Sequence, residues 1–239
     1  MNIKINSKNT IIDSSFLVLE PIICYLLLEF IANSDITNIS PIKTILNILI
    51  LALFEFLFFG ISGNGKKAAT IATVCAGIFG ILNYYVIEFR SIPILAPDVT
   101  VIGTAANVAG NYSFIPNKRA IIFLIIIAIF FVLEMKLMHG PNLCNTKKTK
   151  SKIIASNSNY SKSKRLFVLI SSLIFFFGFF VIAGYTDMLP AAGVNTDVFR
   201  PIKTANINGT MLNFTSSIHS MIPHKPHVKS ILIFINPIM

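Results

Sequence analysis

The sequence predicts an all-α integral membrane protein with five transmembrane helices and a short interfacial helix between the third and the fourth. Of its 239 residues, 54% are hydrophobic and only 13% are charged, whereas about a quarter of the residues in a soluble domain are charged. The mean hydropathy is +0.73, and five stretches approach the roughly 20 apolar residues that a helix needs to cross a bilayer. This composition excludes a disordered chain, a disulfide-rich secreted domain and an ordinary soluble enzyme.

Each predicted span is a long apolar run with few charges. The first is the most interrupted and contains Glu20, Pro21 and Glu29, whereas the second contains a single acid, Glu55. The third has small residues at four-residue spacing, which favours close helix packing. The fourth opens on an isoleucine-rich run and meets Glu134 near its end, and the fifth is the most hydrophobic. In order, the spans cover residues 11–31, 44–61, 68–87, 120–138 and 166–184.

Basic residues in the connections predict the orientation of the chain. Lysines precede the first span, Lys66 and Lys67 lie between the second and the third, and the connection over residues 139–165 is rich in lysine. The alternate connections contain fewer basic residues for their length. Because positively charged loops stay in the cytoplasm, the N-terminus is predicted inside and the C-terminus outside. The chain then divides into a five-helix bundle, residues 1–185, and an extracytoplasmic tail, residues 186–239.

The segment between the third and fourth spans, residues 83–117, is too long for a tight turn and too patterned for a disordered loop. Pro93 and Pro97 favour an extended entry, and Asp98 is then placed as the N-cap of a short helix. Apolar and small residues recur at helical spacing until Gly110, which predicts the end of that helix. We expect this helix to lie in or against the outer surface of the membrane.

Two stretches of the chain carry the pattern of a known family. Asn83–Asp98 contains the core Phe-Arg-x-x-Pro-Ile-Leu-x-x-Asp, and Asn208–Phe214 reads Asn-Gly-x-x-x-x-Phe. Both resemble the membrane domain and the following linker of lipoteichoic acid synthase-like phosphoglycerol transferases. Ser91 stands where that family typically has glycine. Further similar positions are Thr104, Ala105, Val108, Lys225 and Pro226.

In that family, five helices precede an extracytoplasmic catalytic domain of the alkaline phosphatase and sulfatase type. That domain supplies a threonine nucleophile and ligands for a divalent metal, usually manganese. The similarity ends at about Pro226, so we expect no catalytic residue, metal ligand or cofactor in this chain. The resemblance implies the membrane-anchoring portion of an enzyme of the bacterial cytoplasmic membrane, truncated and inactive alone. Such an enzyme makes a glycerophosphate polymer of the cell envelope from phosphatidylglycerol.

Two other functions stay open. One is a stand-alone membrane protein that binds or regulates a full-length synthase. The other is a transporter or flippase that uses buried glutamates, although the chain lacks the internal repeat that many transporters have. The expected partners are the lipid bilayer, with phosphatidylglycerol among its lipids, and a synthase-type catalytic domain or full-length relative. No nucleic acid is expected, because the basic connection has no interleaved aromatic residues for base stacking.

Arg90, Pro93 and Asp98 are the candidate site of the loop. We expect them at the level of the outer headgroups, where the planar guanidinium of Arg90 suits a lipid phosphate. In the family context, this loop would present the lipid headgroup or dock the catalytic domain. The alternative is a structural ion pair, between Arg90 and either Asp98 or Glu88, that only holds the loop.

Glu20, Glu29 and Glu55 are the candidate intramembrane acids. A charged side chain at the centre of a span costs about 2.5–3.5 kcal/mol on insertion scales, so such acids turn toward the bundle or toward water. One interpretation is a pathway for protons or substrate. The other is a carboxyl that is protonated or hydrogen-bonded between helices near a helix end.

Histidines and cysteines predict little chemistry. His219, His224 and His227 cluster in the tail with Asp187 and Asp197, but their spacing matches no common zinc or catalytic pattern. We therefore interpret the cluster as chance. The three cysteines form no closely spaced pair, which predicts neither a disulfide framework nor a zinc site.

Overall fold

The computed structural model describes residues 7–109, 114–139, 154–186, 188–197 and 199–221. These residues form helices and connecting turns and contain no β-strand, which confirms the all-α prediction. Five of the described helices are long and apolar enough to cross a membrane, in agreement with the five predicted spans. They are α1 (Ser7–Ala32), α2 (Pro41–Ser62), α3 (Gly65–Arg90), α5 (Lys118–Leu137) and α6 (Ile154–Tyr185).

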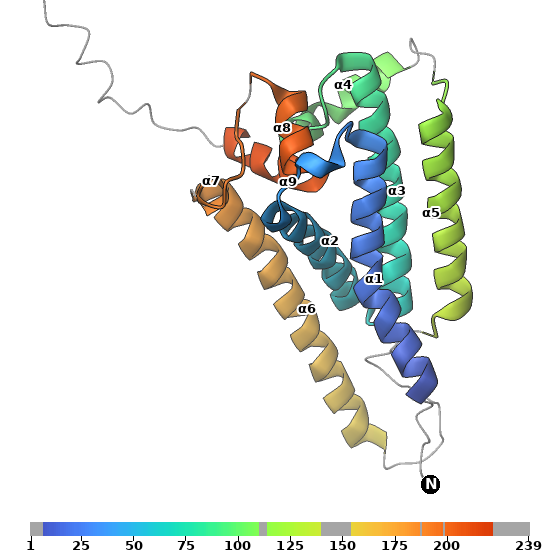
Figure 1. Ribbon diagram of the computed structural model, residues 1–239. Coiled ribbons are helices and arrows are strands. Elements are labelled where there is room, and N and C mark those ends of the chain that lie inside the picture. Colours follow the sequence, from blue (N-terminus) through green and yellow to red (C-terminus); the bar gives the residue numbers. More distant parts are fainter. Residues whose placement is uncertain (1–6, 110–113, 140–153, 187, 198, 222–239) are drawn as a thin grey trace, which may run out of the picture.

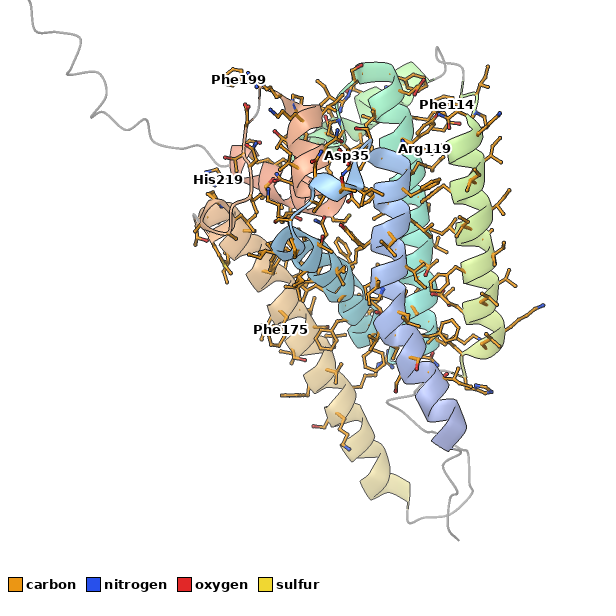
Figure 2. The ribbon with its side chains drawn as sticks, in the orientation of Figure 1. Asp35, Phe114, Arg119, Phe175, Phe199 and His219 are labelled. Atoms are coloured by element: carbon orange, nitrogen blue, oxygen red, sulfur yellow. The ribbon has the colours of Figure 1, made fainter. Side chains whose placement is uncertain are left out.

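Helix α3 is at the centre of the bundle and packs against α1, α2 and α5 (Figure 1). Helix α6 packs along α2, while α5 lies on the opposite side of the bundle against α3 and α1. Large apolar side chains cover the outside of these helices. Phe175 on α6 is 63% exposed and Phe114, just before α5, is 49% exposed (Figure 2). This distribution suits helices that face lipid rather than water.

Glycine and asparagine residues lie at the ends of several of these helices. Gly63 ends α2 with φ 66°, a left-handed conformation that glycine adopts without strain. Asn64 then caps α3 by accepting a hydrogen bond from the Lys67 N–H at 3.1 Å. Asn117 caps α5 in the same way. Because these caps satisfy N–H groups that have no partner inside their own helix, α2 and α3 can be joined by a tight turn.

Gly60 lets α6 approach α2 closely. A β-carbon at this position would lie 2.2 Å from Ser172 Oγ and 3.1 Å from Leu169 Cα. We expect Gly60→Ala to push α6 away from α2 and to lower the thermal midpoint in detergent, with an overpacking cost of about 1–3 kcal/mol. Gly178→Ala is the matched control on α6, because a β-carbon there meets no atom within 4 Å. Equal midpoints for the two variants would contradict this close approach.

The chain after α3 is helical from Ala96, two residues before the predicted N-cap. A 3-10 helix, η2 (Ala96–Val101), continues into α4 (Ile102–Ala109). The prediction that Asp98 is the N-cap was wrong: it is the third helical residue, and its carboxylate accepts a hydrogen bond from the Leu95 N–H at 2.8 Å. An acid three residues after the N-cap commonly reaches back in this way. Gly110 lies outside the described residues, and the position of α4 relative to a membrane stays a prediction.

The described part of the tail folds back over one end of the bundle, which we call the tail end (Figure 1). Helix α9 packs against α1, α2 and α6 there, and a short 3-10 helix before α2, η1 (Ile36–Asn38), contacts α8. The opposite end of the bundle contains the turn between α2 and α3. In chain order, the tail elements are α7 (Met188–Ala191), α8 (Pro201–Asn208), α9 (Thr210–Ser216) and η3 (Ser217–Met221).

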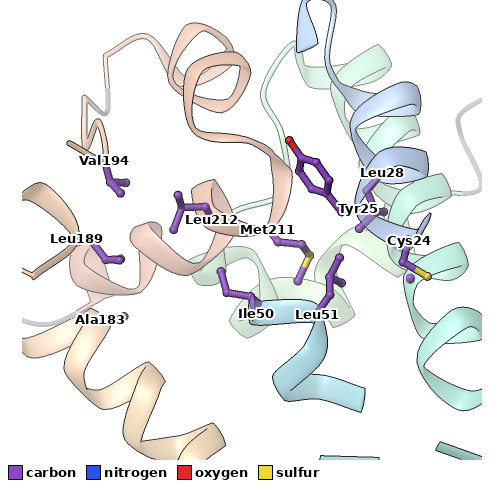
Figure 3. Close-up of a cluster of buried hydrophobic side chains, with 11 residues drawn as sticks. Cys24, Tyr25, Leu28, Ile50, Leu51, Ala183, Leu189, Val194, Met211 and Leu212 are labelled. Atoms are coloured by element: carbon purple, nitrogen blue, oxygen red, sulfur yellow. The ribbon is translucent and has the colours of Figure 1, made fainter. Parts of the chain in front are cut away.

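Apolar residues of the tail share a core with the bundle (Figure 3). Leu189, Val194, Met211 and Leu212 of the tail are buried in one cluster with residues of α1, α2, α3 and α6. The bundle residues of this cluster are Cys24, Tyr25, Leu28, Ile50, Leu51, Ala76 and Ala183. Burying a large aliphatic side chain stabilises a fold by about 1.5–3 kcal/mol in water, so the tail is attached by its core contacts as well as by the covalent chain.

Candidate functional site

A buried polar seat at the tail end holds the helices of the tail. Glu29, near the end of α1, accepts hydrogen bonds from the Thr210 N–H at 2.6 Å and from the Asn33 side-chain amide at 3.0 Å. Thr210 is the first residue of α9, so the carboxylate satisfies an N–H that the helix itself leaves unpaired. Asn33 also donates to Asn206 O at 3.1 Å. We call Glu29, Asn33 and Asn47 the stem seat, and α8, α9 and η3 the stem.

Asn47, in α2, bonds to the stem on both sides of Gly209. Its amide nitrogen donates to Asn208 O at 2.8 Å, and its amide oxygen accepts from the Leu212 N–H at 2.8 Å. The same nitrogen donates to Lys43 O within α2, so the side chain is well satisfied although it is completely buried. Gly209 makes the approach possible, because a β-carbon there would lie 2.4 Å from the Asn47 amide nitrogen.

Arg90 and Asp98 form an ion pair with two hydrogen bonds. Two guanidinium nitrogens donate to the two carboxylate oxygens at 2.9 and 2.7 Å. The structural alternative gave Arg90 two possible partners, Asp98 and Glu88. The structure forms the ion pair with Asp98. Pro93 is buried, and the Ile94 N–H donates to the Asn83 side chain at 2.8 Å. These contacts close the loop over residues 90–98 against the end of α3, and a role in binding lipid stays a prediction.

The ion pair makes the stability of the loop depend on pH. Hydrogen bonds from Arg90 hold the pKa of the Asp98 carboxyl below its ordinary value, against the opposing effect of partial burial. A group with a lowered pKa in the folded state contributes stability above its unfolded pKa, about 4 for Asp, and loses it as the pH falls further. We expect acidification below that value to lower the thermal midpoint of the wild type more than that of Asp98→Asn. The same acid dependence in both proteins would contradict this.

The loop and the stem meet at the tail end. The Ala96 N–H donates to Ser217 Oγ at 2.7 Å. Beside this contact, the ring of Phe79 in α3 packs edge to face on Phe214 of the stem, with centroids 5.6 Å apart. A cavity of about 20 Å³ lies nearby, which is enough for a single water molecule. Its wall includes Asn33, Asn83, Pro93, Asn206 and Thr210.

No protein family, curated protein or solved structure matches this chain. The resemblance to phosphoglycerol transferases therefore stays a prediction, based on residues 83–98 of the loop and 208–214 of the stem. These are the two stretches that the fold brings to the same place at the tail end.

The three predicted intramembrane acids belong to two different sites. Glu29 is part of the stem seat. Glu20 and Glu55 lie deeper in the bundle, where they interact with Glu134 of α5. Thr73 of α3 joins this second group, because its hydroxyl donates to Glu134 Oε1 at 2.8 Å and lies 3.5 Å from Glu20 Oε1.

Sequence reasoning did not identify Asn33, Asn47, Thr73 or Glu134 as site residues. Glu134 lies close to the end of its span, where an acid is easily attributed to the membrane boundary. A signal was present for Asn47, since an amide inside a strongly apolar span needs hydrogen-bond partners from another segment. No pattern within α2 indicates that these partners come from a stem 161 positions away.

The histidine cluster lies only partly within the described residues. His219 is in η3, and its ring nitrogen Nδ1 is 2.9 Å from Gly184 O. His224, His227 and Asp187 lie outside the described residues. Within the described part of the chain, no three His, Cys, Asp or Glu side chains are arranged to hold one metal ion.

Proposed function

We propose that this chain is the membrane-anchoring part of a phosphoglycerol transferase that resembles lipoteichoic acid synthase. In this proposal, the bundle crosses a bacterial cytoplasmic membrane with its N-terminus inside. The stem leaves the outer face toward an extracytoplasmic catalytic domain. In the transfer reaction, the bundle contributes position, because it fixes the point from which that domain reaches phosphatidylglycerol in the outer leaflet.

The contact between the loop and the stem is the observation that carries the proposal. The two stretches that resemble the family are far apart in the sequence, yet Ala96 of the first donates a hydrogen bond to Ser217, which is 121 positions away and follows the second stretch by three residues. Phe214, the last residue of the second stretch, packs on Phe79 of α3, one turn before the first stretch begins at Asn83. A loop that docks a catalytic domain or presents a lipid to it has to lie beside the segment that leads to that domain.

The backbone at Ser91 also supports the resemblance. Ser91 has φ 54° and follows the last residue of α3. It is the one described residue other than glycine with a positive φ. Glycine adopts this conformation without the steric cost of a β-carbon, so the glycine that the family typically has at this position would fit the same turn.

The stem seat supports a fixed joint between the bundle and the stem. Polar groups inside a helix bundle are costly unless they are paired, and Glu29 and Asn47 use theirs to bind backbone atoms of the stem. Because these hydrogen bonds are made to backbone atoms, they fix the position of the stem backbone and do not depend on one particular side chain of the stem. The bundle is therefore suited to presenting the segment after α6 in one position.

A chimera tests the proposed function. Residues 1–221 of this chain would replace the membrane part of a full-length lipoteichoic acid synthase-like enzyme, in cells that lack their own synthase. We expect the membrane-located chimera to restore glycerophosphate polymer. The control is the same catalytic domain on an unrelated membrane anchor of the same orientation.

The comparison with that control decides the outcome. More polymer from the chimera, at equal protein level, supports an anchor that positions the catalytic domain. No advantage over the unrelated anchor would overturn the proposal. Co-purification of this chain with an intact synthase, combined with an inactive chimera, would instead favour the stand-alone regulator.

A further inference from the structure

We propose that Glu20, Glu55 and Glu134 form a proton-binding site inside the bundle, which exchanges protons with water at the end opposite the stem. The three carboxyls come from α1, α2 and α5 and are 1%, 6% and 0% exposed. Two neutral side chains complete the group. Thr73 donates to Glu134 Oε1 at 2.8 Å, and Cys24 Sγ donates to Glu20 Oε1 at 3.2 Å.

One oxygen of each carboxyl lacks a hydrogen-bond partner. These oxygens are Glu20 Oε2, Glu55 Oε1 and Glu134 Oε2, and all three are buried. An ionised carboxylate accepts hydrogen bonds at both oxygens, and a buried charge without such partners is strongly disfavoured. The unpaired oxygens therefore point to a missing positive partner at this place.

Among the residues that the structure describes, no basic side chain acts on the three acids. The groups that act on the three acids are one another, Cys24 and Thr73. Two charged residues near this end of the bundle have partners of their own: Asp13 accepts a hydrogen bond from the His139 N–H, and Lys66 donates to Met135 O. Helix α6, which packs on α2, has no titratable residue between Arg165 and Tyr185.

Protons fit this site better than a metal ion. The three acids are not arranged as a metal-binding group among the described residues. A protonated carboxyl removes the buried charge and gains an O–H donor, which can serve the unpaired oxygen of a neighbouring acid. Three adjacent carboxyls can therefore share protons, whereas three adjacent charges would repel one another at low dielectric.

The site has a short route to the end of the bundle opposite the stem. Glu134 is three residues before the end of α5, which is about 5 Å along a helix. Asp13 lies two turns before Glu20 on α1 and bonds to the segment just after α5. A proton that enters at this end thus meets Asp13 and Glu134 before it reaches Glu20 and Glu55.

Chemical labelling tests the site in the intact protein. The protein in liposomes would be treated with dicyclohexylcarbodiimide, a hydrophobic reagent that modifies protonated carboxyls in apolar surroundings, and the adducts located by mass spectrometry. We expect adducts on Glu20, Glu55 or Glu134 at neutral pH and their loss at alkaline pH. Glu29 is the matched control, because both of its oxygens accept N–H hydrogen bonds, and we expect no adduct there.

Infrared spectroscopy gives an independent measurement. The protonated-carboxyl band should be lost in the triple variant Glu20→Gln/Glu55→Gln/Glu134→Gln and kept in Glu29→Gln, and it should shift in deuterated water. If the triple variant does not fold, the labelling of the wild-type protein is the deciding experiment. Absence of adducts on all three acids in folded wild type would overturn the proposal. Protection by sodium with no dependence on pH would also overturn it, and would indicate a cation site instead.

Discussion

Gly209→Ala is expected to detach the stem from the bundle and to destabilise the protein strongly. Gly209 has φ 86° and ψ 159°, a conformation that costs a residue with a β-carbon about 1–3 kcal/mol. The added carbon would also lie 2.4 Å from Nδ2 and 2.9 Å from Cγ of Asn47. Asn47 cannot move away without breaking its hydrogen bonds to Asn208 O and the Leu212 N–H. Backbone strain and the loss of these bonds therefore act together.

Gly193→Ala is the matched control for this substitution. Gly193 also has a positive φ, 78°, but a β-carbon there meets no atom within 4 Å. We expect the strain to lower the thermal midpoint of both variants in detergent and the collision with Asn47 to lower that of Gly209→Ala further. Limited proteolysis should cleave the stem faster in Gly209→Ala alone. Equal midpoints and equal cleavage would show that the contact at Asn47 does not hold the stem.

The five spans could be predicted because hydropathy is a local property. A run of about 20 apolar residues has to be helical in a bilayer, whatever the rest of the chain does. Pro21 did not end the first helix, since α1 continues through it to Ala32. Proline is tolerated in membrane helices where neighbouring groups satisfy the freed backbone, so its presence was a weak signal for a boundary.

The packing of the stem could not be predicted because its signals are not local. The stem is short and largely polar, and Glu29 and Asn47 reach it across 181 and 161–165 positions of sequence. Single acids and amides inside spans indicated that partners exist, but they did not indicate which segment supplies them. The same limit applies to Glu20, Glu55 and Glu134, whose convergence depends on how α1, α2 and α5 are rotated around α3.

The loop shows how one residue type can serve two local roles. Aspartate is common both as an N-cap and at the third position of a helix, where its carboxylate reaches back to the preceding backbone N–H. Asp98 takes the second role and also binds Arg90. The helix begins at Ala96, two residues before the predicted N-cap, so Asp98 lies at its third position.

Asn47→Ala is expected to release the stem by removing hydrogen bonds, without any collision. The substitution leaves Asn208 O and the Leu212 N–H buried and unpaired, and each such group costs about 1–3 kcal/mol. We therefore expect a lower thermal midpoint in detergent and faster cleavage of the stem than in the wild type. Asn38→Ala is the control, because its amide bonds only to the exposed Asp35. A stem that stays protected in Asn47→Ala would mean that its apolar core contacts are sufficient.

The double variant Asn47→Ala/Gly209→Ala separates the two causes of destabilisation in Gly209→Ala, which are the backbone strain and the collision with Asn47. With Asn47 shortened to alanine, the β-carbon at residue 209 no longer collides with an amide, and the hydrogen bonds that the collision would break are already absent. The two substitutions should therefore destabilise the protein by less than the sum of their separate effects, since neighbouring residues that share partners are not additive. Strict additivity of the thermal midpoints would mean that Gly209 acts through backbone strain alone.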